Sequence, residues 1–237
     1  MSLEKSQGVY EQVGVAMTCR SYQEYMDMFS LTTELLGRGP ILDVGAGASS
    51  FTAGASRLGY MATAVDPLYE MDSQEIYARG KHEIIESTEK LARIASTLRW
   101  DYYGSLDKHQ QNREASLEHF IQAFRADETK ERYVSALLPD LPFANDTFSL
   151  VIGSHFLFLY HQQFDQSFHI NALTELVRVC APGGQIRLYP TVGLDQQPYP
   201  HMEALMDRME HLGCEASLMP TSFRFLQGAE HFLQISK

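Results

Sequence analysis

The segment that most constrains the fold is "ILDVGAGASS", residues 41–50, in which a short apolar run is interrupted by an acid and then gives Gly-Ala-Gly. An apolar run of this length predicts a buried strand, and glycines directly after it predict a turn that lets the backbone approach a ligand closely. A second such run, "YMATAVD", ends at Asp66-Pro67. This order of strand, turn, helix and strand predicts the beginning of an α/β doubly wound sheet.

The chemistry of this turn separates two classes of ligand. The dinucleotide fingerprint has a third glycine, which would stand at Ser50 and is absent. Asp43, just before the first glycine, would repel a pyrophosphate but attract a cationic nucleoside such as S-adenosylmethionine. Asp66 follows about 20 residues later, where a carboxylate can accept hydrogen bonds from both ribose hydroxyls. The alternative is a plain strand–helix turn with an acidic cap and no ligand.

Further strands and helices alternate along the chain. Residues 72–132 are charged and helical in pattern, and they are too long for a simple crossover, so they predict a helical insertion. The last two strands predict an antiparallel hairpin at the sheet edge. Helices are expected over residues 10–36, from Ser49 or Ser50 to about 58, over 165–180 and over 201–212. Strands are expected over 132–138, 148–156, 185–190, 215–221 and 230–236, with a turn over 181–184.

Composition restricts the class of partner. The chain has 237 residues, of which 44% are hydrophobic, enough to bury one core. A formal net charge of −11 disfavours a nucleic-acid surface, which needs clustered lysine and arginine. The polar start lacks a signal-peptide pattern, and the longest apolar run, 150–160, is too short to span a bilayer. Three widely spaced cysteines favour a reduced, cytoplasmic protein. We therefore expect a small-molecule partner, with no nucleic acid and no membrane, and the oligomeric state stays open.

Four segments in their usual order resemble the motifs of class I S-adenosylmethionine-dependent methyltransferases: "ILDVGAGASS", "AVDP", "DLPFANDTFSLVIGSHFLFLYH" and "LTELVRVCAPGGQIRLY". The Ser-His followed by aromatics is similar to a small-molecule-type bacterial branch of unknown substrate. The resemblance implies a Rossmann-like methyltransferase fold in a single domain, 1–237. Its seven-stranded, mostly parallel sheet would have an antiparallel edge hairpin, an N-terminal helical cover (1–38) and a helical insertion after strand two (72–132).

The resemblance also implies where the cofactor, S-adenosylmethionine, would lie. The methionine end would bind at Asp43 and the glycine turn, and the ribose at Asp66. The family often has an acid that contacts adenine where this chain has Leu137, so the adenine is expected to lie against apolar side chains instead, including Leu68. A second departure, Ser149 in place of the commoner aspartate, concerns the fold. The cofactor-binding residues expected are Asp43, Gly45, Ala46, Gly47, Asp66, Pro67, Leu138, Ser154 and Arg20.

Residues that leave the fourth strand are expected to face the transferred methyl group, because ligands in such sheets lie outside the carboxyl ends of the strands. His155 or His161 can remove a proton from the acceptor near neutral pH. The alternative for His155 is a hydrogen-bonded structural role at a strand end. The candidate catalytic residues are His155, Tyr160 and His161.

Two further interpretations concern a possible metal site and one arginine. A metal site at His155, His161 and His169 is rejected, because their spacing matches no compact ligand motif and no cysteine pair joins them. Arg20, just before the first predicted amphipathic segment, can meet the carboxylate of the cofactor if that segment covers it. A surface arginine is the alternative.

The insertion contains an aromatic group, Trp100, Tyr102 and Tyr103, that can line a substrate pocket or build the insertion's own core. Arg113 can recognise an anionic group of a substrate or lie on a solvated helix face.

The sequence therefore predicts a methyltransferase that uses S-adenosylmethionine to methylate oxygen, nitrogen or carbon of a small molecule. A non-catalytic S-adenosylmethionine-binding protein would carry the same motifs. An NAD-dependent oxidoreductase is a weaker alternative, because Asp43 and the absent third glycine count against it.

Overall fold

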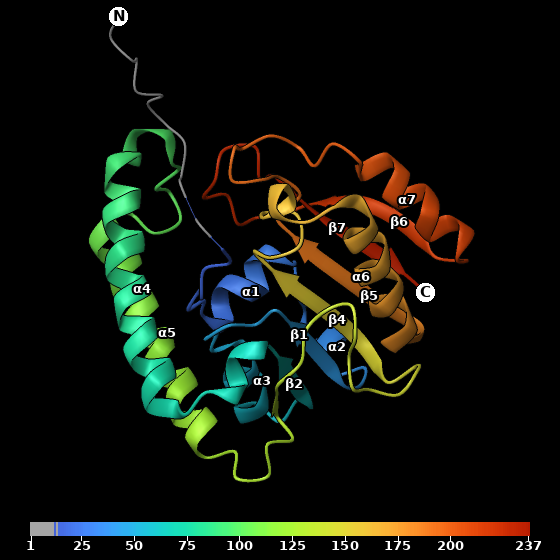
Figure 1. Cartoon of the computed structure of the whole chain (residues 1–237), viewed down its shortest axis with the longest axis horizontal. Helices are drawn as coiled ribbons and strands as arrows, with labels where there is room; N and C mark the ends of the chain where they lie inside the picture. The colour runs from blue at the N-terminus through green and yellow to red at the C-terminus, as the bar shows by residue number, and fades with distance from the viewer. Residues whose placement is uncertain (1–11, 13) are drawn as a thin grey trace, which may run out of the picture.

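The apolar run after Pro40 forms β1 (Ile41–Val44), which pairs in parallel with β4 (Phe148–Ser154) at the centre of a seven-stranded sheet. The computed structural model describes residue 12 and residues 14–237 (Figure 1). The other strands are β2 (Ala62–Val65), β3 (Tyr133–Val134), β5 (Cys180–Tyr189), β6 (Glu215–Pro220) and β7 (His231–Ser236).

The strand order is β3-β2-β1-β4-β5-β7-β6. The five strands from β3 to β5 are parallel, whereas β7 is antiparallel to both β5 and β6. The chain leaves β1 toward β2 and β3 on one side and returns through β4 toward β5 on the other. The sheet therefore has a topological switch point between β1 and β4, where α/β sheets bind their ligands.

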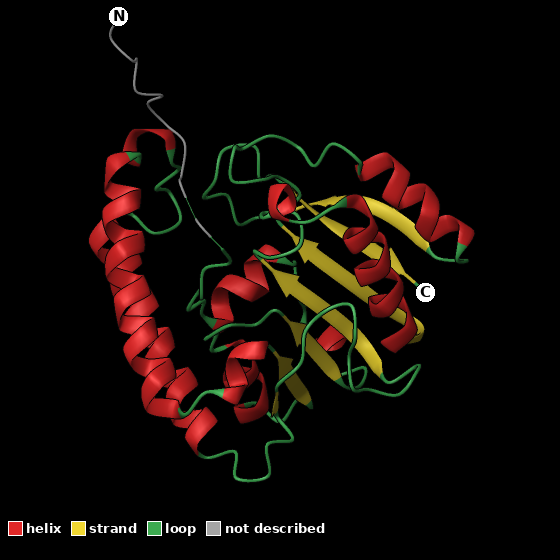
Figure 2. Cartoon of the chain, viewed as in Figure 1, coloured by secondary structure: helices red, strands yellow, loops and turns green. Residues whose placement is uncertain are grey.

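Helices cover both faces of the sheet (Figure 2). On β4, Leu150 and Ile152 pack into the core formed with α1 and α3, and Val151 points into the core on the opposite face, with α6. This alternation is expected of a central strand, in which successive side chains point to opposite faces. The α-helices are α1 (Tyr22–Met28), α2 (Thr33–Leu36), α3 (Phe51–Arg57), α4 (Ser73–Arg93), α5 (Leu106–Arg125), α6 (Gln166–Val179) and α7 (Met202–His211). Short 3-10 helices are η1 (Pro67–Glu70), η2 (Ala95–Thr97) and η3 (His161–Gln163).

The helix predicted over residues 10–36 is wrong in its extent. Residues 1–11 and 13 lie outside the described part of the chain, and residues 14–21 are not helical. α1 begins only after Ser21, whose backbone N–H donates to the Glu24 carboxylate at 2.7 Å in a capping box. Ser30, at φ +48°, interrupts the helical run before α2. The cover is therefore an irregular segment followed by two short helices.

The insertion between β2 and β3 is a long hairpin of α4 and α5 that stands beside the sheet (Figure 1). Asp72 caps α4 by accepting hydrogen bonds from the backbone of Gln74 and Glu75 at 2.7 and 2.9 Å. A Cβ added at Gly80 would stand 2.8 Å from the methyl groups of Leu117, so the glycine allows the two helices to approach closely. The hairpin buries its apolar side against η1 and β3.

Residues 181–184, predicted as a turn, belong to β5. Phe148 pairs with Cys180 but Leu150 pairs with Gln185, so the segment bulges out of the ladder, and Gly183 takes φ +76° within it. β3 is only two residues long and thus shorter than the strand predicted over 132–138. The seven-stranded doubly wound sheet, its antiparallel edge hairpin and the insertion after strand two are confirmed. No helix in the described ranges has the length and apolar character to cross a bilayer.

Candidate functional site

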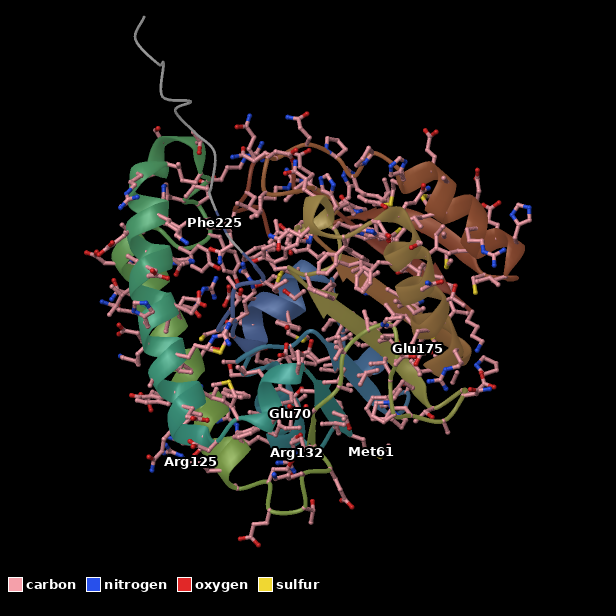
Figure 3. The ribbon with its side chains drawn as sticks, in the orientation of Figure 1. Met61, Glu70, Arg125, Arg132, Glu175 and Phe225 are labelled. Atoms are coloured by element: carbon pink, nitrogen blue, oxygen red, sulfur yellow. The ribbon has the colours of Figure 1, made fainter. Side chains whose placement is uncertain are left out.

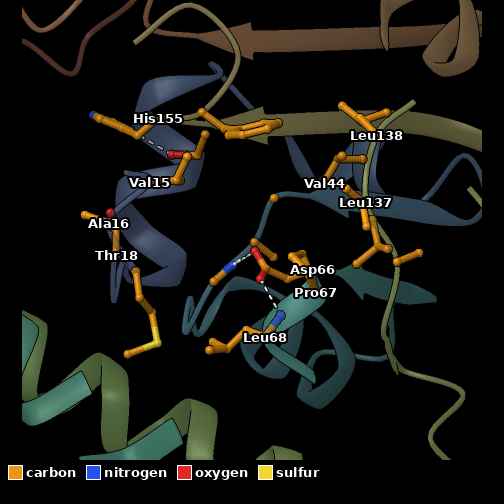
Figure 4. A pocket seen from close by; sticks show the side chains of 18 of the residues that line it. Val15, Ala16, Thr18, Val44, Asp66, Pro67, Leu68, Leu137, Leu138 and His155 are labelled. Carbon is orange, nitrogen blue, oxygen red and sulfur yellow. Dashed lines mark hydrogen bonds between the residues drawn. The ribbon is translucent and has the colours of Figure 1, made fainter. Parts of the chain in front are cut away.

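A pocket of about 420 Å³ opens at the carboxyl ends of β1, β2 and β4, at the switch point of the sheet. Its volume falls within the range of about 300–1,000 Å³ usual for small-molecule sites. Residues 15–20, here called the strap, close one side of it. In Figure 4, Leu137 and Leu138 lie on the side opposite Val15, and Asp66 lies between them. The predicted residues that line this pocket are Arg20, Gly45, Ala46, Gly47, Asp66, Pro67, Leu138, Ser154 and His155.

The glycine turn forms the floor of the pocket. Gly45 and Gly47 take φ +63° and +55°, a conformation that other residues rarely adopt. A Cβ at Gly45 would stand 3.2 Å from the ring of Phe156, and one at Gly47 would stand 3.4 Å from the backbone of Thr18. The left-handed turn therefore favours glycine at both positions, and at Gly45 the close approach of the Phe156 ring favours it as well.

Asp66 stands at the end of β2 and closes the turn. Its Oδ2 accepts a hydrogen bond from the Gly47 N–H and its Oδ1 one from the Leu68 N–H, both at 2.9 Å. Each carboxylate oxygen has two lone pairs, so both can still accept a bond from a ligand hydroxyl. Burial raises the pKa of Asp66, and the two backbone N–H groups oppose that rise.

Asp43 lies beneath the turn rather than in the pocket wall. Its side chain is buried, and its Oδ1 accepts a hydrogen bond from the Tyr25 hydroxyl at 3.2 Å. Its Oδ2 has no hydrogen-bond partner among the described residues. Burial raises the pKa of Asp43 well above its ordinary value, and the Tyr25 bond lowers it in part. A cation near the turn would stabilise the ionised form of this carboxyl.

The other end of the pocket is apolar. Leu68 and Leu138 are buried there, and Leu137, at the position where the family often has an acid, is 64% exposed. A planar base in this region would be held by apolar contact and backbone groups. Sequence reasoning missed several residues that line the pocket, which come from the strap, the end of η1, the segment after β4 and α6: Met17, Thr18, Met71, Phe164 and Phe168.

His155 is held in an unusual conformation at the end of β4. It takes φ +54°, its backbone N–H donates to the Tyr189 carbonyl at 2.6 Å, and its Nδ1 lies 2.8 Å from Ser154 Oγ. Its ring points away from Asp66 (Figure 4). Burial lowers the pKa of His155 well below its usual range, and the charges of Arg20 and Arg113 lower it further. A base this weak is poorly matched to removing a proton at neutral pH.

The other two candidate catalytic residues lie outside this pocket. The Tyr160 hydroxyl accepts a hydrogen bond from the Ala16 N–H at 3.1 Å and so helps to fix the strap. His161 lies in η3, with its ring 5.5 Å from the Tyr199 ring, and lines neither this pocket nor the neighbouring cavity. The structure therefore does not bring His161 to the site.

Arg20 is buried in the strap, so the alternative of a surface arginine is wrong. Its Nη1 donates to Glu24 Oε1 at 3.2 Å, and its Nε has no hydrogen-bond partner among the described residues. Arg113, on α5, donates to both oxygens of Glu24 at 2.7 and 2.8 Å, so the solvated helix face expected as its alternative is also wrong. Sequence reasoning missed Glu24, although the Ser-x-x-Glu capping box was visible.

The insertion's aromatic residues build a core. Tyr103 and Trp100 pack edge-on against Phe225, at ring distances of 5.0 and 5.3 Å, and Tyr102 packs against Phe223. Phe225 lies beside the α4–α5 hairpin in Figure 3. None of the three insertion aromatics lines the pocket.

A smaller cavity of about 100 Å³ adjoins the pocket. Both spaces are lined by His155 and by part of the strap, including Arg20. In the described part of the chain, no three histidine, cysteine or acidic side chains gather in a way that would hold a metal ion.

The known proteins that match this chain are distant in sequence. No protein-family model matches the chain. Over 220 residues the chain is 27% identical to an uncharacterized protein of Methanocaldococcus jannaschii, a match that covers 92% of this chain and 94% of that protein.

Solved structures that match the chain include several S-adenosylmethionine-dependent methyltransferases. The match with one of them, from Thermotoga maritima, covers 90% of this chain and 89% of that protein, with 14% identity and a TM-score of 0.42. An O-methyltransferase family protein of Burkholderia thailandensis covers 91% of this chain at 10% identity and a TM-score of 0.49, and the match spans 55% of that protein. The placement in a small-molecule-type bacterial branch stays a prediction. By its own strand order, with an antiparallel β7 between β5 and β6, the chain has the Rossmann-like fold of the class I methyltransferases.

Proposed function

We propose that this protein is a methyltransferase that takes its methyl group from S-adenosylmethionine and transfers it to a small molecule. The observation that carries the proposal is the meeting of the glycine turn, Asp66 and an apolar end in one pocket at the switch point of the sheet. The pocket has the volume for a nucleoside with an amino-acid arm.

The residues present fit that cofactor. The Asp66 carboxylate retains free lone pairs for the ribose hydroxyls, and Leu68 and Leu138 offer apolar contact to the adenine. The turn at Gly45 to Gly47 would carry the methionine end. Below it, the unpaired Oδ2 of Asp43 suits the ammonium and sulfonium charges better than a pyrophosphate, which the carboxylate would repel.

Arg20 would bind the cofactor's carboxylate. Its side chain lines the pocket, and Nε has no partner among the described residues. An arginine is the side chain best suited to a carboxylate, because its planar donors match both oxygens. The Glu24 carboxylate also pairs with Arg113, so it compensates the Arg20 charge only in part. The remaining positive charge favours an anionic group of the ligand.

The bound cofactor would supply an activated methyl group on a sulfonium. The chain's own contribution would be to hold the acceptor in line with it and to exclude water, and alignment alone can supply several kcal/mol of the barrier, roughly 7–11 kcal/mol at best. His155 would act as a positioning residue, because its imidazole is neutral at the end of β4 and is fixed by Ser154. We assign no base role to His161.

Calorimetric titration with S-adenosylmethionine, S-adenosylhomocysteine and NADH, at one pH and one salt concentration, tests the class of ligand. Saturable binding of the two sulfur nucleosides without binding of NADH is expected. Binding of NADH alone would overturn our interpretation of Asp43 and favour an oxidoreductase. A non-catalytic S-adenosylmethionine-binding protein would bind the same two nucleosides but form no methylated product with any acceptor.

The proposal also includes a cytoplasmic location and a small-molecule acceptor. The three cysteines, Cys19, Cys180 and Cys214, are free and buried, which suits a reducing cytoplasm. A small-molecule acceptor suits an acidic protein better than a nucleic acid does.

A further inference from the structure

The smaller cavity lies on the side of the pocket where a methyl acceptor would stand. The strap, α4, α5 and the segment after β4 enclose it. It shares Arg20 and His155 with the larger pocket, so the two spaces meet beside the end of β4. If the cofactor occupies the larger pocket, a molecule in the smaller cavity would face its reactive end.

Three buried nitrogen atoms on the side chains that line this cavity lack hydrogen-bond partners among the described residues. They are Arg20 Nε from the strap, His109 Nδ1 from α5 and His155 Nε2 from the end of β4. All three residues are less than 9% exposed. An unpartnered buried polar atom costs about 1–3 kcal/mol. Arg20 Nε would be taken by the cofactor's carboxylate, and the two histidine nitrogens that remain point to a second, polar ligand.

The charge around the cavity favours an anion. Arg20 and Arg113 share the single carboxylate of Glu24, which leaves one guanidinium charge in excess. The cofactor's carboxylate would balance that excess, and its sulfonium would then provide the positive charge that attracts an anionic acceptor. Glu83 also lines the cavity, and Arg79, which lies 3.9 Å from its carboxylate, compensates it. Burial lowers the pKa of His109 to about 2, with further lowering by Arg113 and Arg20, so the imidazole is neutral and lies in a positive field.

The size of the cavity restricts the body of the ligand. Its volume of about 100 Å³ is smaller than the roughly 150 Å³ cavity that accommodates benzene in another protein. Most of the remaining wall is apolar, with Ile84, Leu159 and Phe225 among its members. A short hydrocarbon body of a few carbon atoms suits this space.

We propose that the smaller cavity receives the methyl acceptor and that this acceptor is a small organic carboxylate, held by His109 beside Arg113, while Arg20 binds the cofactor's carboxylate. This inference rests on the proposed function. A lone pair of the oxyanion forms the new O–C bond to the methyl carbon, the C–S bond breaks, and its electron pair stays on sulfur. The carboxylate and the sulfonium become a neutral ester and a neutral thioether. No proton has to be removed, which agrees with the weak basicity of His155.

The test uses the full chain saturated with S-adenosylhomocysteine, so that the larger pocket and its carboxylate position are filled. Butanoate, butanamide and butylammonium are then titrated as isosteric anion, neutral molecule and cation, with benzoate as a larger anion. Butanoate is expected to bind about tenfold or more tightly than butanamide, the effect of one charge-assisted hydrogen bond, and butylammonium is expected not to bind. With S-adenosylmethionine in place of the product, methyl butanoate is expected and can be detected by mass spectrometry.

Two variants locate the bound anion. His109→Phe should weaken butanoate binding about fivefold to tenfold and leave the affinity for S-adenosylhomocysteine unchanged, because His109 lines only the smaller cavity. His119→Gln, at an exposed position on the same helix, should change neither affinity.

Each alternative outcome overturns a different statement. Three outcomes would refute the oxyanion site, provided that S-adenosylhomocysteine still binds. They are tighter binding of butylammonium than of butanoate, equal affinities for butanamide and butanoate, and an affinity for butanoate that His109→Phe leaves unchanged. Failure of S-adenosylhomocysteine itself to bind would refute the proposed function, and the acceptor site with it.

Discussion

The Arg113 guanidinium on α5 holds both carboxylate oxygens of Glu24 on α1, at 2.7 and 2.8 Å. The two residues are 89 positions apart, so this buried ion pair joins the helical insertion to the segment that covers the pocket. Tyr103 also donates to Glu24, and the Arg113 Nη2 lies 2.8 Å from that hydroxyl. Arg113 Nη1 also donates to the Cys19 carbonyl at 3.2 Å, so this cluster fixes the position of the strap relative to the insertion.

Glu24→Gln is expected to lower the free energy of unfolding by about 3–5 kcal/mol, because it leaves two buried guanidinium groups without their anion. Burial alone would raise the pKa of Glu24, but Arg113 and Arg20 outweigh it and bring it to about 2. The ionised Glu24 carboxylate therefore stabilises the fold fully at pH values above 4.5, the ordinary pKa of a glutamate. This contribution to the free energy of unfolding is lost as the pH falls toward 2. Urea unfolding at several pH values measures both effects.

Glu34→Gln is the matched control, since Glu34 forms an exposed pair with Arg38 and should cost less than about 1 kcal/mol. Equal losses for the two variants would show that the buried pair contributes nothing beyond an exposed one.

Stability should also depend on pH through His109. Its pKa falls from 6.5 to about 2 in the folded state, through burial and then through Arg113 and Arg20, so the unfolded chain binds one more proton between these values. Unfolding therefore becomes easier as the pH drops below 6.5, by about 1.4 kcal/mol per pH unit for this histidine. His109→Phe should reduce the slope of the unfolding free energy against pH by about one proton between pH 6 and pH 5. Identical slopes for His109→Phe and the unmodified protein would place a protonated imidazole in the folded state.

The central part of the fold could be predicted because its signals are local. The run before Gly45 and the run before Asp66 each contain a strand and the turn that follows it, and parallel pairing then brings the two ends together. The pocket follows from this arrangement, because ligands bind at the carboxyl ends of such strands.

The remainder depends on contacts that sequence spacing does not encode. Arg113 has the same local pattern whether it faces water or a carboxylate 89 residues away. The N-terminal segment has a helical periodicity, but the strap packs against Gly47 in a non-helical form, so tertiary contact overrides the local pattern. His161 follows β4 closely in sequence, yet it lies in η3 and does not line the pocket.

Asp66→Ala should weaken binding of S-adenosylhomocysteine by roughly 1–3 kcal/mol, because buried ribose hydroxyls and the N–H groups of Gly47 and Leu68 lose their acceptor. Calorimetry of the purified variant measures the change. Asp72→Ala is the control, because it removes the N-terminal cap of α4, which costs about 1 kcal/mol of stability, but leaves the pocket intact. Unchanged affinity in Asp66→Ala would show that the ribose lies elsewhere.

Arg20 offers the sharpest test of how the cofactor is oriented, because its proposed partner is a single group of the ligand. Arg20→Gln should weaken binding of S-adenosylhomocysteine by about 1.5–3 kcal/mol, the contribution of a hydrogen bond to a charged group. The same variant should bind 5′-methylthioadenosine as the unmodified protein does, since that nucleoside lacks the amino-acid arm. Parallel titrations of the two nucleosides give the difference directly.

Arg79→Gln is the matched control, because Arg79 lines the same pocket but is partly exposed and pairs with Glu83. Any effect of that substitution should be the same for both nucleosides, as a general change in pocket charge would be. An equal loss for both nucleosides in Arg20→Gln would mean that Arg20 shapes the whole pocket through Glu24. No loss for either would place the carboxylate away from Arg20 and leave its unpaired Nε to the smaller cavity alone.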